Sequence, residues 1–155
     1  FAHAFGDDRS VSLKIGGDGV DRPRLEALAA ELGVADRVYF LGALTREQVV
    51  DQVASADAFV LSSRYETFGV VVIEALALGK PVIATRCGGP ETIVREQDGL
   101  LVPVDDVPAL ADAMRRLRTH HACYPAQAVR DACVARFGET AVIKRLVQVY
   151  AEILQ

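Results

Sequence analysis

The chain is poor in the residue types that mark several common classes of protein. Among its 155 residues there is no tryptophan, one methionine and only three cysteines. The cysteines, Cys87, Cys123 and Cys133, are odd in number and have no metal-like spacing. This predicts free thiols rather than a disulfide framework or a zinc site, and a reducing compartment such as the cytoplasm.

The chain also lacks long runs of basic residues and long apolar stretches. No cluster of lysine or arginine stands out and the formal net charge is -4, which argues against a nucleic-acid groove or an anionic membrane surface. No apolar stretch reaches the roughly 18 residues that cross a bilayer, and no signal peptide opens the chain. We therefore expect a cytoplasmic protein whose contact with a membrane, if any, is not made through this domain. With 51% hydrophobic and 25% charged residues, the chain is typical of a single globular domain.

Short apolar runs alternate with helical patterns along the chain. We expect strands at about 11–15, 38–41, 58–61, 81–84 and 100–102, with helices between them. Asp21 is placed to cap the first of these helices, and Thr45 with Gln48 forms a capping box for the next. Further helices are expected at about 107–118, 125–136 and 139–153. The pattern predicts an α/β fold with a doubly wound parallel sheet, covered on both faces, and C-terminal helices.

Ligands of such sheets bind in the crevice at the carboxyl ends of the strands. The loops expected at that edge are 16–19, 42–45, 62–68 and 85–90. Two of them are glycine-rich, so that backbone can approach a ligand closely, and the last two lead into helices whose N-termini favour an anion. This predicts a ligand that carries phosphate.

The helix expected at 69–78 is apolar all round and is therefore expected to be buried, with Glu74 as its one exception. No residue three or four positions from Glu74 can pair with a carboxylate. Glu74 either reaches solvent or a distant Lys or Arg, or it faces a ligand. Glu66, in the preceding loop, is either a solvated loop carboxylate or a second ligand for the hydroxyls of a polyol.

Residues 63–69 read Ser-Arg-Tyr-Glu-Thr-Phe-Gly, and residues 72–84 continue with Glu-Ala after the helix start and Gly-Lys-Pro-Val after the helix. This combination resembles the signature of the group 1 glycosyltransferases, the retaining GT-B enzymes of family 4. Segments 16–19, 38–42, 56–60 and 88–91 also resemble that family, so that the likeness spans about residues 11 to 118. It implies the Rossmann-like, donor-binding half of a GT-B fold.

The resemblance also implies site residues. Glu66 is the catalytic candidate; it would hold hydroxyls of the donor sugar and would not act as a nucleophile. The implied donor-binding residues are Glu74, Phe68, Gly69, Val70, Thr67, Gly16, Gly17 and Leu44. Among these, Glu74 would accept hydrogen bonds from the ribose, and the backbone at 68–70 would hold the diphosphate. Leu44 would lie near the base and the two glycines would line the cleft, although simple packing and tight-turn geometry remain open for these three. Arg64 and Arg86 flank the crevice, either reaching phosphate or standing in solvent.

The chain departs from the family pattern in two places. The family's first strand, its Gly-Arg-x5-Lys-Gly-like loop and the N-terminal acceptor domain have no counterpart before Val11, and the loop at 88–91 is one residue shorter than usual. We therefore interpret residues 1–155 as a single nucleotide-sugar-binding domain that lacks its first strand and its acceptor domain, and we expect the isolated chain to be inactive.

The expected reaction of the parent enzyme is hexosyl transfer, with retention, from a nucleoside diphosphate sugar to an acceptor hydroxyl, without metal or other cofactor. The alternatives are a non-catalytic nucleotide-binding module and a nucleotide-sugar isomerase or hydrolase with a GT-B fold. A dinucleotide-binding domain is disfavoured because residues 16–19 lack the Gly-x-Gly-x-x-Gly spacing.

Overall fold

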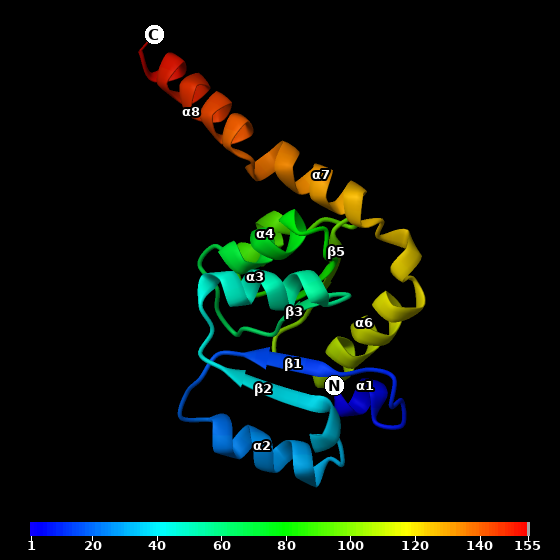
Figure 1. Cartoon of the computed structure of the whole chain (residues 1–155). Helices are drawn as coiled ribbons and strands as arrows, with labels where there is room; N and C mark the ends of the chain where they lie inside the picture. The colour runs from blue at the N-terminus through cyan, green and yellow to red at the C-terminus, as the bar shows by residue number, and fades with distance from the viewer. Residues whose placement is uncertain (155) are drawn as a thin grey trace.

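The computed structural model describes residues 1–154 and shows strands and helices alternating along the chain (Figure 1). The strands are β1 (Leu13–Gly16), β2 (Val38–Gly42), β3 (Phe59–Leu61), β4 (Val82–Thr85) and β5 (Gly99–Val102). The helices are α1 (Ala2–Phe5), α2 (Arg22–Glu31), α3 (Arg46–Ser55), α4 (Val70–Ala77), α5 (Gly89–Ile93), α6 (Val107–Thr119), α7 (Ala126–Phe137) and α8 (Glu139–Ile153), with 3-10 turns η1 (Ala35–Arg37) and η2 (His121–Cys123). The sequence prediction of alternating strands and helices is confirmed.

All strand pairs are parallel, as the predicted doubly wound α/β fold requires, and within the described residues the strands form two sheets. β1 pairs with β2, whereas β3, β4 and β5 form a separate sheet in that order. β1 and β3 are therefore not hydrogen-bonded to each other, and each keeps one unpaired edge. Apolar patterning identifies a strand, but it does not determine which neighbour that strand pairs with, because pairing depends on every strand present.

Two apolar clusters lie on opposite faces of the β3–β4–β5 sheet. Val82 and Ala84 of β4 pack with residues of α4, α5 and α7, while Ile83, between them, packs against α6. The alternation follows from the period of two in a strand, which sends successive side chains to opposite faces. Since both faces are covered, all four residues of β4 are buried, as expected for a central strand in a doubly wound fold.

The predicted helix starts are confirmed at α3 and corrected at α2. At α3 the Thr45 side chain accepts the Gln48 N–H, and the Gln48 side chain accepts the Thr45 N–H, which completes the capping box. Asp21 does not cap α2: its backbone is already helical (φ -81°, ψ -10°), and its carboxylate accepts from Arg24 Nε at 3.2 Å. A capping side chain needs an extended backbone to reach back to the first N–H groups, so Asp21 is placed too far into the helix turn.

The prediction that the apolar helix around Glu74 is buried is only partly correct. Val72, Ala75 and Leu76 of α4 are fully buried, but Val70 is 56% exposed and Val71 is also exposed. The exposed pair occupies the first turn, next to the loop that leaves β3. Thus the N-terminus of α4 stands open to solvent while its body lies in the core.

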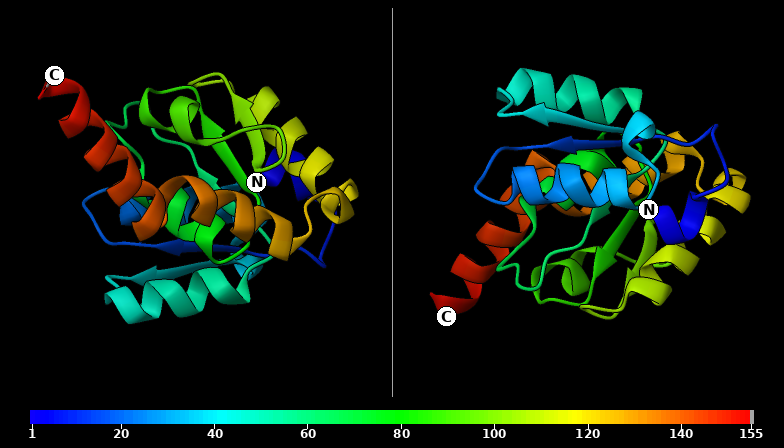
Figure 2. Two further views of the ribbon diagram at one scale, coloured as in Figure 1. Left: turned by 90° about the horizontal axis from the view of Figure 1, so that it is seen from above. Right: turned by 90° about the horizontal axis from the view of Figure 1, so that it is seen from below.

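The C-terminal helices leave the body of the domain. α7 packs on α4, whereas α8 extends away from the rest of the chain in both Figure 1 and Figure 2. Apolar side chains of α8, among them Leu146, Val147 and Ile153, are exposed. No helix within residues 1–154 is both long enough and apolar enough to cross a membrane.

Candidate functional site

The glycine loops after β1 and β2 lie together at the carboxyl edge of their sheet. Gly17 N–H donates to Gly42 O at 2.8 Å, and a Cβ added to Gly16 would lie 3.0 Å from Leu44 Cδ1. Glycine at position 16 therefore lets Leu44 pack directly over the end of β1. The structure brings together three predicted site residues, Gly16, Gly17 and Leu44. Packing accounts for the contact between Gly16 and Leu44.

The Glu66 loop is joined to the loop after β4 by backbone hydrogen bonds. Glu66 N–H donates to Cys87 O at 3.0 Å, and Gly89 N–H donates to Glu66 O at 2.8 Å. The two loops approach so closely at Gly89 that a Cβ there would lie 2.1 Å from Phe68 O. The prediction that Glu66 and Gly88 lie on the same sheet edge is confirmed by the bridge between them. Within residues 1–154 the Glu66 carboxylate makes no hydrogen bond or ion pair, so it is available to a ligand.

The N-terminus of α4 carries free backbone donors next to Glu66. Its N-cap is Gly69, in the left-handed conformation (φ 93°), which provides no capping side chain. The position of a Cβ on Gly69 lies 3.6 Å from Glu66 Cγ, which places the helix start beside the glutamate stem. The N–H groups of Val70 and Val71, with the helix dipole behind them, suit an anion such as phosphate.

Glu74 lies about one turn further along α4 and pairs with an arginine that the sequence did not identify. Arg46 Nη2, at the start of α3, lies 3.7 Å from Glu74 Oε1. The Glu74 side chain is 39% exposed, so it is neither a deeply buried charge nor a fully solvated one. Pairing with a distant arginine, one of the two readings left open, is thus observed, and one carboxylate oxygen remains free.

Arg64 and Arg86 have ion-pair partners in the chain. Arg64 Nε donates to both oxygens of Asp105, at 2.8 and 3.1 Å, and Arg86 Nη1 lies 3.8 Å from Glu91 Oε2. Both arginines are exposed, as the solvent reading predicted. Thr67 is exposed and makes no hydrogen bond with any described residue.

Sequence reasoning missed two arginines at this edge, Arg22 and Arg46. Arg22 Nη1 lies 3.5 Å from the position of a Cβ on Gly42, and its Nε donates to Glu26 at 2.8 Å. Both arginines stand in the first turn of a helix that follows a glycine loop. That position, at the carboxyl edge of the strands, is the signal by which they could have been found.

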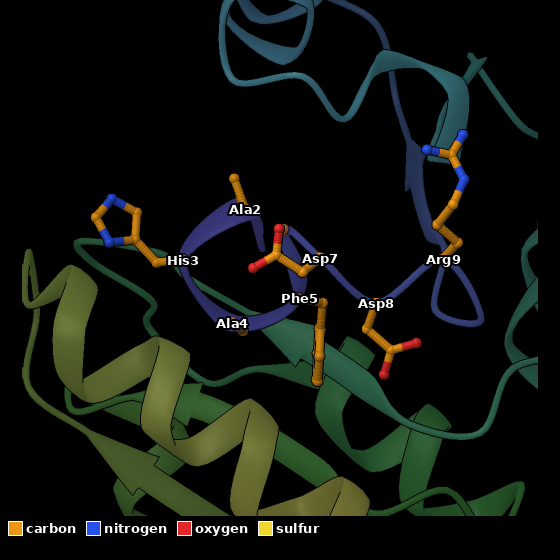
Figure 3. A pocket seen from close by; sticks show the side chains of 8 residues that line it. Ala2, His3, Ala4, Phe5, Asp7, Asp8 and Arg9 are labelled. Carbon is orange, nitrogen blue, oxygen red and sulfur yellow. The ribbon is translucent and has the colours of Figure 1, made fainter.

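Two hollows on the surface lie away from the Glu66–Glu74 region. One, of about 500 Å³, is lined by residues 2–9; Figure 3 shows the side chains of Asp7 and Asp8 around it. The other, of about 330 Å³, lies over α2 and β2 and includes Arg22. Neither is lined by a residue of the predicted donor site. The site is therefore an open edge formed by loops, and no group of three metal-ligating side chains lies within the described residues.

The geometry defines a class of protein: an α/β domain with a phosphate-compatible helix N-terminus flanked by two carboxylates. The model of the family described as glycosyl transferases group 1 matches residues 2–120. The chain therefore belongs to the group 1 glycosyltransferases, and the resemblance seen in the sequence is confirmed.

Individual relatives agree with this assignment. The chain is 39% identical over 137 residues to a D-inositol 3-phosphate glycosyltransferase of Corynebacterium urealyticum, which covers 86% of this chain. It is 33% identical over 144 residues to the lipopolysaccharide core biosynthesis glycosyltransferase LpsE of Rhizobium meliloti, which covers 91% of this chain. The chain spans 32% and 42% of the length of these two relatives.

Solved structures confirm the fold. A lipopolysaccharide outer core galactosyltransferase, WaaB, superposes with a TM-score of 0.81 at 25% identity, over 91% of this chain and 41% of that one. Sucrose-phosphate synthase of Thermosynechococcus elongatus superposes with a TM-score of 0.76 at 36% identity, over 92% of this chain and 38% of that one. The described residues thus have the Rossmann-like fold of GT-B glycosyltransferases.

Proposed function

We propose that this chain is the donor-binding domain of a glycosyltransferase that moves a sugar, with retention, from a nucleoside diphosphate to an acceptor hydroxyl. The observation that carries the proposal is the order of groups along one sheet edge of a group 1 family member. Glu66, the open N-terminus of α4 and Glu74 follow one another in a stretch of nine residues, 66–74.

Each group has a chemical task in this proposal. The diphosphate binds to the N–H groups at 68–70, where the helix dipole stabilises the charge that develops on the leaving group. Glu74 accepts hydrogen bonds from the ribose hydroxyls, and Glu66 holds hydroxyls of the donor sugar. The rest of the donor site is lined by Thr67, Gly16, Gly17 and Leu44. Neither a metal ion nor another cofactor is assigned a role.

We further propose that a parallel strand from elsewhere in a longer polypeptide lies between β1 and β3. β1 and β3 each have one edge without a strand partner in the described residues, and the residues of β3 are only half-buried where those of β4 are buried. Open edges of this kind are normally paired or covered. The share of the relatives' length that this chain spans supports a second domain, which would hold the acceptor. The cytoplasmic location stays a prediction from the free thiols.

Isothermal titration with UDP, GDP and ADP tests the donor site. We expect weak binding of at least one, and Glu74→Gln should weaken it by about 1–3 kcal/mol because charge-assisted hydrogen bonds are lost. Glu31→Gln, which removes an exposed charge at the far end of α2, is the control. Absence of binding by all three nucleotides, or equal effects of the two variants, would refute the proposed site.

A sugar-transfer assay tests whether a second domain is needed to hold the acceptor. The chain incubated with nucleotide sugars and acceptors should form no glycoside, since positioning of the acceptor is a term that reaches about 7–11 kcal/mol of the barrier. Turnover at the rate of a complete enzyme would contradict the proposal that a second domain is needed.

A further inference from the structure

Arg46 occupies a position that its own helix does not favour. It is the first residue of α3, and a positive charge at a helix N-terminus opposes the helix dipole. It takes no part in capping, since Thr45 and Gln48 make both capping hydrogen bonds. Its side chain is 89% exposed and makes no hydrogen bond with any residue from 1 to 154. Local structure therefore gives no reason for an arginine here.

Arg46 contacts Glu74, the residue proposed to bind the ribose. Its Nη2 lies 3.7 Å from Glu74 Oε1, and neither side chain forms another ion pair with a described residue. Val70, Val71, Ala77 and Leu78, the neighbours of Glu74 on its own helix, are apolar and provide no competing partner. Thus the direction of the Glu74 carboxylate depends on a residue from a different helix.

We propose that Arg46 is a positioning residue of the donor site: it turns the Glu74 carboxylate toward the β2–α3 loop so that the free oxygen meets the ribose hydroxyls. This inference rests on the proposed function. A carboxylate has two oxygens that can accept several hydrogen bonds, so one can face Arg46 while the other accepts from ribose. Leu44, two residues before Arg46, sits over the end of β1, which keeps this loop close to the place assigned to the base.

Arg46 can affect nucleotide binding in two ways, either by orienting Glu74 or by attracting the diphosphate directly. The two ways differ in whether they require the Glu74 carboxylate and the ribose hydroxyls. If it acts through Glu74, its contribution disappears when Glu74 is neutral or when the ribose lacks both of its hydroxyls. If it acts directly on the diphosphate by charge, it contributes equally to nucleotides with and without those hydroxyls. The distance to Glu74 supports the first way.

A double-mutant cycle separates the two. The variants Arg46→Gln, Glu74→Gln and their combination are titrated with UDP, GDP and ADP and with the 2′,3′-dideoxy analogue of each. We expect Arg46→Gln to weaken binding of the ribonucleotide by about two- to fivefold, the size of an exposed ion pair. We expect little effect on the dideoxy analogue, and none in the Glu74→Gln background.

Two further variants complete the experiment. Arg46→Lys should retain most of the affinity because it keeps the charge. Arg24→Gln, another exposed first-turn arginine with one carboxylate partner, should have no effect.

The possible failures are distinguishable. Equal weakening for the ribo- and dideoxynucleotides, or weakening that persists in Glu74→Gln, would overturn the positioning role and leave the proposed donor site intact. Tighter binding by Arg46→Gln would also overturn it, because Arg46 would then be a competitor of the ribose. If none of the ribonucleotides binds, the proposed function fails and this inference fails with it.

Discussion

Removal of Arg136 should destabilise the domain more than removal of any exposed charge. Arg136 Nη2 lies 2.5 Å from Asp98 Oδ2, and Nη1 donates to Ile93 O at 2.7 Å. The Asp98 side chain is completely buried and that of Arg136 is 13% exposed. The pair joins α7 to the start of β5 and to the end of α5, whose N-terminus contacts the Glu66 loop. The ion pair therefore stabilises α5, which contacts the Glu66 loop of the candidate site.

The magnitude follows from what Arg136→Ala leaves behind. The Asp98 carboxylate would keep one hydrogen bond, from Arg95 N–H at 3.1 Å, while its Oδ1 already lacks a partner in the described residues. Breaking a buried ion pair in this way costs about 3–5 kcal/mol, because a charge remains buried without compensation. For a domain of this size the midpoint of thermal unfolding should fall by roughly 6–20 °C.

Urea unfolding followed by circular dichroism measures the loss. The double variant Asp98→Asn with Arg136→Met removes both charges and retains the Arg95 contact, so it should recover a large part of the stability. Arg136→Lys provides a milder single change if the alanine variant does not fold. A loss below about 1 kcal/mol for Arg136→Ala, or a double variant no more stable than the single one, would refute the reasoning.

The remaining predictions concern the loops, a helix cap and acid stability. Gly89→Ala should destabilise the fold by about 1–3 kcal/mol or more in urea unfolding, because its Cβ would meet Phe68 O at 2.1 Å; Gly19→Ala, with open space around it, is the control, and equal effects would contradict the close approach. Thr45→Ala should cost about 1 kcal/mol through loss of the α3 cap, whereas Ser12→Ala should not, and an unchanged unfolding midpoint for Thr45→Ala would argue against the cap. The side chain of Ser10, followed by its backbone N–H and Arg118, lowers the pKa of Asp8 from 3.8 to about 2. Because the folded pKa is the lower one, this contribution to stability is present above about pH 3.8 and is lost as the pH falls toward 2. Asp8→Asn should therefore flatten the pH dependence of the unfolding midpoint in that window, and a profile identical to that of the unchanged chain would count against it.

Local patterns in the sequence were sufficient to predict the secondary structure. Each expected strand and helix is present with its ends shifted by no more than two residues, because period, glycine and capping residues act within a few positions of one another. The capping box of Thr45 is of this kind. The bridge between Glu66 and Gly88 joins two loops, and it was predictable because parallel strands bring their carboxyl ends to one edge. The family signature at 63–84 likewise identified the family from sequence, and the family model confirmed it.

The tertiary structure decided what depends on residues far apart in the chain. Asp21 is a residue type that often caps helices, but its backbone conformation does not allow it to do so, and Val70 is apolar but 56% exposed. The partner of Glu74 is 28 positions away on another helix, and the partners of the Asp98 carboxylate are Arg136 of α7 and the backbone N–H of Arg95, after α5. The separation of β1 from β3 depends on which strands are available to pair. The sequence by itself determined the elements, the family and the edge at which the candidate site lies. Which charges meet at that edge was decided only by the fold, since long-range contacts follow from packing and not from local spacing.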